Sequence, residues 1–353
     1  MSSLYGEKVK ITVFGQSHSE SIGVVIDGFP SGVKIDTEHL KEFMQRRAPG
    51  RIYTTPRKEA DEVEFISGLN EKGLTCGAPI TALIKNTNKK SADYDNIKIR
   101  PRPSHSDLVS MLKNGEGCDI RGGGQFSGRL TAPICVAGAL CLKVLESLGV
   151  KIGAHVYKLG DHVDDGYSAT NDIIDINLPD FPALNPEKAS KMQDELLNAS
   201  KEGDSIGAVV ECKVVGLPVG LGDPMFDGVE SRLAKMLFGI PAVKGVEVGA
   251  GFEVAKRKGS ENNDAIIVRD GKIVTETNND GGINGGITNG MPVIFRVAFK
   301  PTPSIAKPQK TVNVNTMQEE MLEIKGRHDP CVALRAVPVV EAAAAIAFLD
   351  MLL

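Results

Sequence analysis

The sequence predicts an α+β fold in which antiparallel sheets and helices form layers. Strand-like segments outnumber helical ones, and no glycine-rich strand-to-helix motif of a doubly wound sheet is present. Segment 127–148 has helical periodicity and few polar residues, which indicates a buried helix, and segment 334–353 contains a second apolar helix. No linker divides the 353 residues, so we expect a single domain over 1–353.

Each element follows from a local signal. A helix is expected at 37–47 because Leu40, Phe43 and Met44 recur at helical spacing. Residues 278–290 contain five glycines and predict an irregular segment that a ligand can approach closely. In chain order, strands are expected at 9–14, 24–27, 62–66, 80–84, 150–157, 206–215, 243–248 and 292–299, and helices at 37–47, 127–148, 185–201, 228–238 and 334–353.

Composition and charge exclude several classes of protein. Hydrophobic residues make up 41% and charged residues 24%, the ordinary composition of a globular chain. Aromatic residues make up only 5% and the net charge is −4, which argues against a nucleic-acid-binding module. No apolar run approaches 18 residues without a charge, and residues 1–10 lack the apolar core of a signal peptide, so no membrane partner is expected. The six cysteines show no CxxC spacing, which predicts a reduced, cytoplasmic protein without a metal site.

Positive charge gathers in loops rich in glycine and proline. Arginine matches carboxylate and phosphate groups, and glycine turns offer backbone N–H donors, so such loops are suited to anions. If the loops converge, the site would hold a small ligand with several anionic groups. The clusters are Arg46, Arg47, Arg51 and Arg57; Arg100 and Arg102; Arg121 and Arg129; Lys300 and Lys307; and Arg327.

Two histidines, His18 and His105, lie in turns and are each flanked by serines. A histidine in a polar loop can transfer protons near neutral pH. Asp329 lies in an otherwise basic loop, where it could orient an arginine or act as a base, and the residues alone leave both roles open. His155 lies in an expected strand with no basic cluster around it, so we assign it no role. The pattern indicates an enzyme with histidine acid–base chemistry that acts on a small polyanion.

A series of long motifs resembles the chorismate synthase family over essentially the whole chain. A single such motif would be weak, whereas the series occurs in the order that the family has. The motifs are Phe14-Gly15-Gln16-Ser17-His18, Arg46-Arg47-Ala48-Pro49-Gly50-Arg51, Arg102-Pro103-Ser104-His105-Ser106-Asp107, Asp119-Ile120-Arg121-Gly122-Gly123-Gly124, Gly203-Asp204-Ser205-Ile206-Gly207, Val243-Lys244-Gly245-Val246-Glu247, Gly281-Gly282-Ile283-Asn284-Gly285-Gly286-Ile287, Lys300-Pro301-Thr302-Pro303-Ser304 and Gly326-Arg327-His328-Asp329-Pro330-Cys331-Val332.

The resemblance implies a lyase that eliminates phosphate from 5-enolpyruvylshikimate 3-phosphate to give chorismate. It implies reduced FMN as cofactor without net redox change, with NADPH as a candidate reductant, and leaves open whether the chain reduces its own flavin. It also implies a homotetramer and a β-α-β sandwich with two antiparallel sheets packed inside and helices outside. The alternative that stays open is a flavin-independent enzyme acting on another small phosphorylated polyanion.

The resemblance also implies roles for individual residues. His18 would protonate the leaving phosphate, His105 would lie beside the reduced flavin, and Asp329 with Ser17 would relay the abstracted proton. This chain has Gln125 where many family members have arginine. The residues implied to bind substrate anions are Arg46, Arg47, Arg51, Arg129 and Arg335, and those implied to contact the flavin are Gln125, Phe126, Ser127, Ala242, Gly285, Lys300, Pro301, Thr302, Pro303, Ser304 and Arg327.

Overall fold

Two five-stranded antiparallel sheets dominate the computed structural model, which describes residues 3–50, 53–54, 61–87, 97–172, 174, 181–324 and 329–353. The first sheet has the strand order β1-β2-β3-β5-β4, and the second has the order β7-β6-β8-β14-β9. The first is built from β1 (Leu4–Tyr5), β2 (Lys10–Gly15), β3 (Ser21–Asp27), β4 (Val63–Ser67) and β5 (Ile80–Lys85), and the second from β6 (Lys151–Leu159), β7 (His162–Val163), β8 (Ala208–Val215), β9 (Val243–Val248) and β14 (Val293–Phe299).

The remaining elements are helices and three two-stranded hairpins. The hairpins are β10 (Ile266–Arg269) with β11 (Lys272–Thr275), β12 (Ile283–Asn284) with β13 (Ile287–Thr288), and β15 (Gln309–Asn313) with β16 (Gln318–Leu322). The α-helices are α1 (Thr37–Arg47), α2 (Asp107–Asn114), α3 (Thr131–Ser147), α4 (Pro186–Lys201), α5 (Val229–Leu237), α6 (Gly259–Asn262) and α7 (Ala333–Leu352). Short 3₁₀ segments occur at Gly115–Gly117, Arg121–Phe126, Gly128–Leu130, Met225–Asp227 and Gly251–Lys256.

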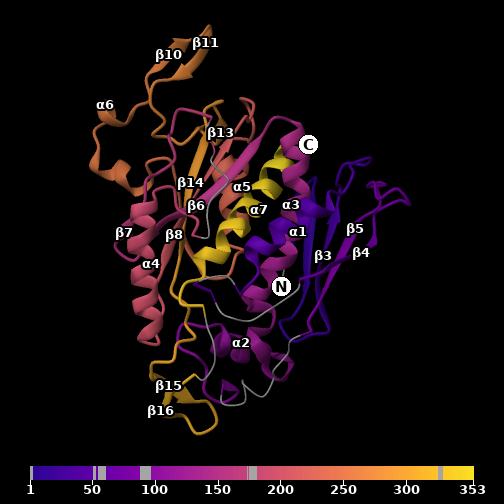
Figure 1. Ribbon diagram of the computed structural model, residues 1–353, viewed down its shortest axis with the longest axis vertical. Helices are drawn as coiled ribbons and strands as arrows, with labels where there is room; N and C mark the ends of the chain where they lie inside the picture. The colour runs from indigo at the N-terminus through magenta and orange to yellow at the C-terminus, as the bar shows by residue number, and fades with distance from the viewer. Residues whose placement is uncertain are drawn as a thin grey trace.

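The two long apolar helices lie between the two sheets, as Figure 1 shows. α3 packs on β3 and β5 of the first sheet, α7 packs on β6 and β8 of the second, and the helices pack on each other. The α+β class is confirmed, but the expectation of sheets inside and helices outside is wrong. Both helices are buried along most of their length, so they need cover on both sides, which a central position supplies.

Close approach of the two central helices depends on one small residue in each. A Cβ added at Gly138 in α3 would overlap the Cβ of Ala342 in α7. The span Arg121–Ser147, which includes α3, is long and apolar enough to cross a membrane, but 72% of its apolar window is buried inside the protein. Burial of this kind is what the core helix of a layered protein requires.

Most predicted elements are confirmed to within a few residues. The helix at 37–47 has the expected bounds, and Asp36 caps it by accepting from the backbone N–H of His39 at 3.0 Å. The helix expected from 127 begins at Thr131, because Gly128–Leu130 forms a 3₁₀ turn. The segment 278–290 is irregular except for the β12–β13 hairpin. Sequence patterns predicted neither α2 nor the hairpins β10–β11 and β15–β16, which are short and largely exposed.

Candidate active site

The turn Gly122-Gly123-Gly124 lies against the loop that follows β2. Its three φ angles are 60°, 90° and 55°, a left-handed conformation that glycine adopts without steric cost. A Cβ on Gly122 would overlap the ring of His18 and would lie 2.5 Å from Ser17 Oγ. The backbone N–H of Ser17 donates to the carbonyl of Gly124 at 3.0 Å. The turn therefore holds Ser17 and His18 against bare backbone.

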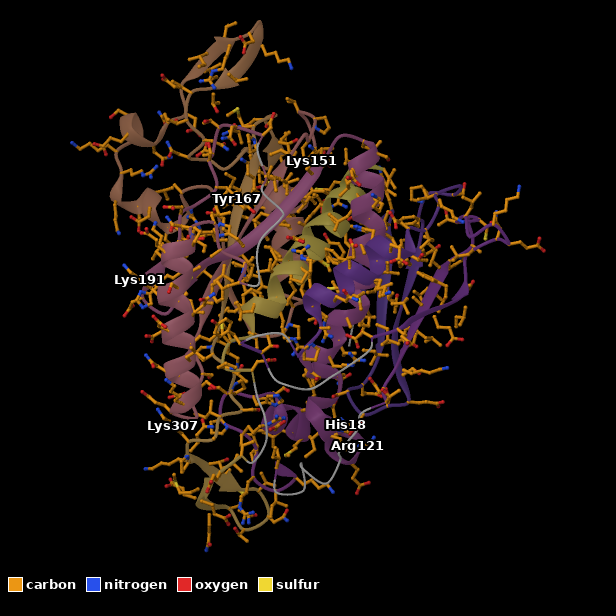
Figure 2. The ribbon with its side chains drawn as sticks, viewed as in Figure 1. His18, Arg121, Lys151, Tyr167, Lys191 and Lys307 are labelled. Carbon is orange, nitrogen blue, oxygen red and sulfur yellow. The ribbon has the colours of Figure 1, made fainter. Side chains whose placement is uncertain are left out.

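The middle glycine of the turn faces the second candidate histidine. A Cβ on Gly123 would lie 3.4 Å from Cε1 and 3.5 Å from Nε2 of His105. Figure 2 places His18 beside Arg121, the residue before the turn, at the lower end of the molecule. Two histidines from distant segments of the sequence thus meet on one glycine turn, as the sequence predicts if its basic loops converge.

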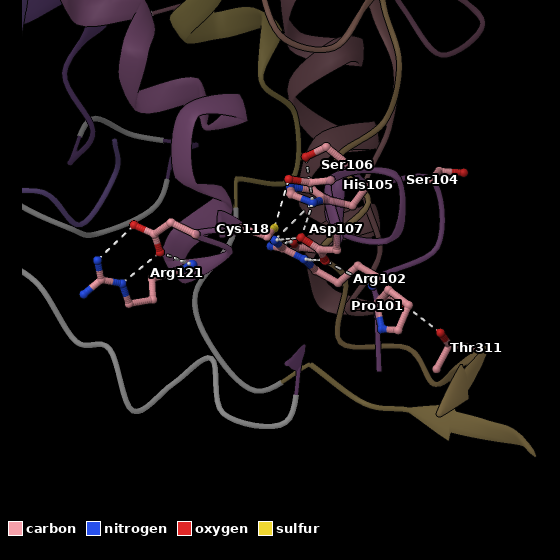
Figure 3. Close-up of polar contacts among 12 residues, drawn as sticks. Pro101, Arg102, Ser104, His105, Ser106, Asp107, Cys118, Arg121 and Thr311 are labelled. Atoms are coloured by element: carbon pink, nitrogen blue, oxygen red, sulfur yellow. Dashed lines mark hydrogen bonds and ion pairs between the residues drawn. The ribbon is translucent and has the colours of Figure 1, made fainter. Parts of the chain in front are cut away.

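His105 precedes α2, and its ring contacts a buried carboxylate (Figure 3). Nδ1 of His105 lies 2.6 Å from Asp107 Oδ1. Arg102 donates to both carboxylate oxygens of Asp107, at 2.7 and 2.8 Å. Burial alone would raise the pKa of Asp107, but hydrogen bonds from Arg102 and His105 outweigh it and hold that pKa well below its usual range. Asp107 is therefore ionised at any pH near neutrality.

The segment Lys300–Ser304 adjoins the His105 loop. Nζ of Lys300 donates to the carbonyl of Ser104, and Arg102 Nη1 donates to Ser304 Oγ at 3.1 Å. The backbone N–H of Lys300 donates to the carbonyl of Ala242 at 3.0 Å, and Ala242 has a φ of 74°. Burial, followed by the nearby charge of Lys244, lowers the pKa of Lys300. Several of the predicted flavin contacts are thus joined to His105 by hydrogen bonds.

Two predicted substrate-binding arginines share one carboxylate. Arg47 Nη1 donates to Asp61 Oδ2 at 2.7 Å, and Arg129 Nη1 pairs with Asp61 Oδ1. Arg47 also donates to Thr131 Oγ1, and Arg129 donates to Asn86 Oδ1, both at 3.2 Å. The Asp61 side chain is only 1% exposed, so this bridge holds both guanidinium groups in a protected position.

Asp329 lies against an arginine. Arg335 Nη1 donates to Asp329 Oδ2 at 2.7 Å, and Arg335 Nε donates to the carbonyl of Arg47 at 3.0 Å. Of the two roles that the sequence left open, the geometry therefore places Asp329 where it orients an arginine. A second role in proton transfer is compatible with this contact, because a carboxylate has more than one acceptor site.

Arg46 is engaged within the core. Its guanidinium makes two hydrogen bonds to Glu341 in α7, at 2.7 and 2.8 Å. Glu341 Oε1 also accepts from the backbone N–H of Ala154 in β6, at 3.0 Å. This contact ties α1 to the central helix and to the second sheet, so Arg46 has a structural function besides any contact with a ligand.

The other predicted residues are distributed as follows. Gln125 and Phe126 are exposed, and Ser127 Oγ accepts from the backbone N–H of Arg129 at 3.3 Å. Gly285 lies in the turn between β12 and β13, and Figure 1 shows β13 toward the upper end of the molecule and α2 toward the lower end. Pro301 is exposed and Pro303 is half-buried within the Lys300–Ser304 segment, whereas Arg51 and Arg327 lie outside the described residues.

Sequence reasoning did not identify two carboxylates that organise the site, Asp61 and Asp107. Asp107 belongs to a motif that the sequence analysis quoted, and its spacing of two residues from His105 was a usable signal. Asp61 belongs to no motif. Its burial beside two arginines is visible only in the fold, because the strands and helices that surround it are distant in sequence.

The residues at the site fit the flavin that the resemblance implies. Thr302 Oγ1 is buried and has no hydrogen-bond partner among the described residues. The Gly122–Gly124 turn beside His105 presents backbone without side chains, and Lys300 adds a cation. A planar ring system with polar atoms and a phosphate tail can use all three features.

Comparisons with known proteins identify the family. A sequence model of a family described as chorismate synthase matches residues 9–353. Two relatives named chorismate synthase, from Lancefieldella parvula and Dehalococcoides mccartyi, are 42% and 44% identical, each covering 100% of this chain, with 96% and 97% of their own lengths matched. A third, from Korarchaeum cryptofilum, is 43% identical over 98% of this chain and 96% of its own length. A crystal structure of chorismate synthase has a TM-score of 0.77 and 27% identity, covering 98% of this chain and 92% of that chain.

Proposed function

The chain belongs to the chorismate synthase family and is a lyase of the shikimate pathway that forms chorismate, and we propose that its reaction takes place at the Gly122–Gly124 turn. The observation that carries this placement is the meeting of His18 and His105 on adjacent glycines of that turn. The substrate, 5-enolpyruvylshikimate 3-phosphate, has one phosphate and two carboxylates, which suits a site bordered by arginine and lysine.

We infer that the substrate's anions are bound by the predicted arginines Arg46, Arg47, Arg51, Arg129 and Arg335. Support comes from the pairs Arg47–Asp61 and Arg335–Asp329, which orient the guanidinium groups before any ligand arrives. Preorganised charges stabilise an anionic leaving group without reorganisation at the moment of reaction.

The elimination breaks the C–O bond to phosphate and removes a proton from a ring carbon, and the electron pair of the C–H bond ends in the new double bond. His18 is the proposed donor of a proton to the departing phosphate oxygen. Asp329, with Ser17, is the proposed acceptor of the carbon-bound proton, and His105 is proposed to hold a proton beside the cofactor. Reduced FMN, when bound, supplies electron density that eases C–O cleavage.

We propose that FMN is held by the segments 125–127 and 300–304 together with Ala242 and Arg327. Gly285 lies on the β12–β13 hairpin toward the other end of the molecule, so its contact with the flavin stays a prediction of the resemblance. The free hydroxyl of Thr302 and the cation of Lys300 support the second segment. NADPH as reductant, a homotetramer, a cytoplasmic location and a single domain over 1–353 stay predictions. The apolar side chains of Ile266, Val268 and Ile273, exposed on the β10–β11 hairpin, favour assembly with other copies.

An anaerobic assay tests this proposal. The chain is mixed with 5-enolpyruvylshikimate 3-phosphate and photoreduced FMN, and chorismate absorbance and free phosphate are measured together. Equal amounts of both products are expected, and no product with reduced FMN would overturn the proposal. Equal turnover without any flavin would instead support the flavin-independent alternative. Replacing light with NADPH shows whether the chain reduces its own flavin.

A further inference from the structure

We propose that Asp107 is a positioning residue for His105, which holds the proton of the neutral ring on Nδ1 and leaves Nε2 to exchange protons with bound molecules. The proposal deepens the proposed function, since it concerns the same site, and rests on His105 having a part in that reaction. It gives a function to the carboxylate of Asp107, which contacts neither substrate nor cofactor in the proposed reaction.

The contacts of Nδ1 determine which ring nitrogen carries the proton. Nδ1 lies 2.6 Å from Asp107 Oδ1, 3.1 Å from Arg102 Nη2 and 3.4 Å from Ser106 Oγ, a hydroxyl that can accept the hydrogen of Nδ1 as well as donate to it. Arginine has no acceptor, so a contact with Arg102 alone would favour a bare Nδ1. A bare Nδ1 would however place its lone pair against an ionised carboxylate oxygen at 2.6 Å, which is repulsive. The shorter contact with the charged acceptor therefore places the hydrogen on Nδ1.

Arg102 keeps Asp107 in place and ionised. Its guanidinium makes two hydrogen bonds to the carboxylate, and its backbone N–H donates a third at 3.1 Å. The side chain of Asp107 is 1% exposed, so water does not compete for these bonds. Because all these donors stabilise the ionised form, Asp107 orients the imidazole and does not itself take the proton.

The same hydrogen bonds connect the ring to the proposed flavin segment. Arg102 Nη1 donates to Ser304 Oγ at 3.1 Å, so Ser304, Arg102, Asp107 and His105 form one chain of contacts. Figure 3 labels the last three of these residues. At the far end of this chain, Nε2 lies on the side of Gly123, 3.5 Å from the position that a Cβ on that glycine would take. The orientation of the ring is thereby fixed before any ligand binds.

Nitrogen-15 NMR of the ligand-free chain tests the proposal without relying on activity. Long-range ¹H–¹⁵N correlations of labelled histidine distinguish the two neutral tautomers, and we expect His105 to be the Nδ1–H form. A wild-type ring in the Nε2–H form would overturn the proposal. This measurement needs no variant, so it does not depend on whether a substituted chain folds.

Variants supply the second test. Asp107→Asn brings an amide N–H to Nδ1 and Asp107→Ala removes the acceptor, so both are expected to shift His105 toward the Nε2–H tautomer. In the anaerobic assay with reduced FMN, kcat should fall about 10–100-fold with little change in KM. This loss is smaller than the full rate factor that an acid–base group contributes, because His105 itself is still present. Glu320→Gln, which breaks the Arg100–Glu320 pair away from any histidine, is the matched control and should leave tautomer and kcat unchanged.

The outcomes separate the two proposals. Folded Asp107 variants with the wild-type tautomer and wild-type kcat would overturn the positioning role while the proposed function stands. A wild-type chain that makes no chorismate would overturn the proposed function, yet a tautomer shift in Asp107→Asn would still support the positioning role.

Discussion

A histidine, a carboxylate and an arginine come together both beside the glycine turn and in the second sheet. The first cluster is His105, Asp107 and Arg102 beside the glycine turn. The second lies across the second sheet, where His155 in β6, Glu211 in β8 and Arg296 in β14 are directly opposite one another in register. Figure 2 shows Tyr167, whose ring packs on His155, well above His18, so the clusters occupy different parts of the molecule.

The clusters differ in what surrounds the histidine ring. His155 Nδ1 lies 3.3 Å from Asp164 Oδ2, its Nε2 lies 3.3 Å from Glu211 Oε1, and its side chain is 0% exposed. His105 is 16% exposed, and within the part of the chain that the structure describes only its Nδ1 contacts a carboxylate. Residue types alone thus do not distinguish an acid–base site from a structural ion cluster. The two kinds of site differ in whether a ring nitrogen of the histidine is free of carboxylate contacts and accessible to a ligand.

The largest effect expected from this comparison is on turnover. His18→Ala and His105→Ala should each lower kcat by roughly 10²–10⁴-fold, because each removes a proton-transfer group. His155→Asn should keep kcat near the wild-type value, since that ring faces only buried carboxylates. Chorismate formation with reduced FMN measures all three, and FMN titration of His105→Ala should show that binding is retained. Wild-type rates in both histidine-to-alanine variants would refute the assignment.

A large effect on stability is expected from the buried carboxylate of Asp61, which Arg47 and Arg129 share. Asp61→Asn leaves Arg47 and Arg129 facing a neutral amide, and breaking a buried ion pair on one side costs about 3–5 kcal/mol. Urea unfolding measures the loss. Asp119→Asn removes the exposed partner of Arg121 and should cost only about 0–1 kcal/mol. Equal losses in the two variants would contradict the importance given to burial.

A smaller effect is expected from filling the glycine turn. Gly122→Ala combines a left-handed φ with a clash against His18, so both stability and kcat should fall, the former by about 1–3 kcal/mol. Gly271→Ala has a similar φ of 73° but meets no neighbour within 4 Å, and serves as the control. The excess loss in Gly122→Ala over the control isolates the packing of the turn on His18.

The smallest effect concerns pH and the second cluster. Burial alone would lower the pKa of His155, but hydrogen bonds with Asp164 and Glu211 outweigh it and raise the pKa. A raised pKa in the folded state contributes stability below the ordinary value near 6.5 that is lost as pH rises through the folded value. Unfolding free energy should therefore decline above about pH 6.5 in the wild type, and this part of the decline should vanish in His155→Asn.

The other titratable groups around His155 determine whether its contribution to the pH dependence can be measured separately. Asp164 and Glu211 have lowered pKa values, so their contribution is lost in the acid range and does not overlap with that of His155. Arg296, Lys213, Tyr157 and Tyr167 complete the surroundings. An unchanged slope in the variant would show that His155 is neutral in the folded protein.

The sequence predicted the site residues that belong to local motifs. His18, His105 and the Gly122–Gly124 turn were identified because unusual residues stand next to one another along the chain. The position of Asp61 and the order of the layers depend on contacts between distant segments, which no local pattern contains. The apolar composition of α7 predicted a helix, but only its contacts with α3 and β6 show that it lies between the sheets.

The central position of α7 has a consequence for how the protein is made. α7 follows every strand of both sheets along the chain, and Asp350 near its end accepts hydrogen bonds from the backbone N–H groups of Glu7, Lys8 and Val9. During synthesis on the ribosome, α3 emerges early enough to cover the first sheet, whereas β6 and β8 of the second sheet emerge before α7, the helix that packs on them, exists. The inner apolar face of the second sheet must stay exposed until then, so nascent chains have an interval in which chaperones or aggregation compete with folding.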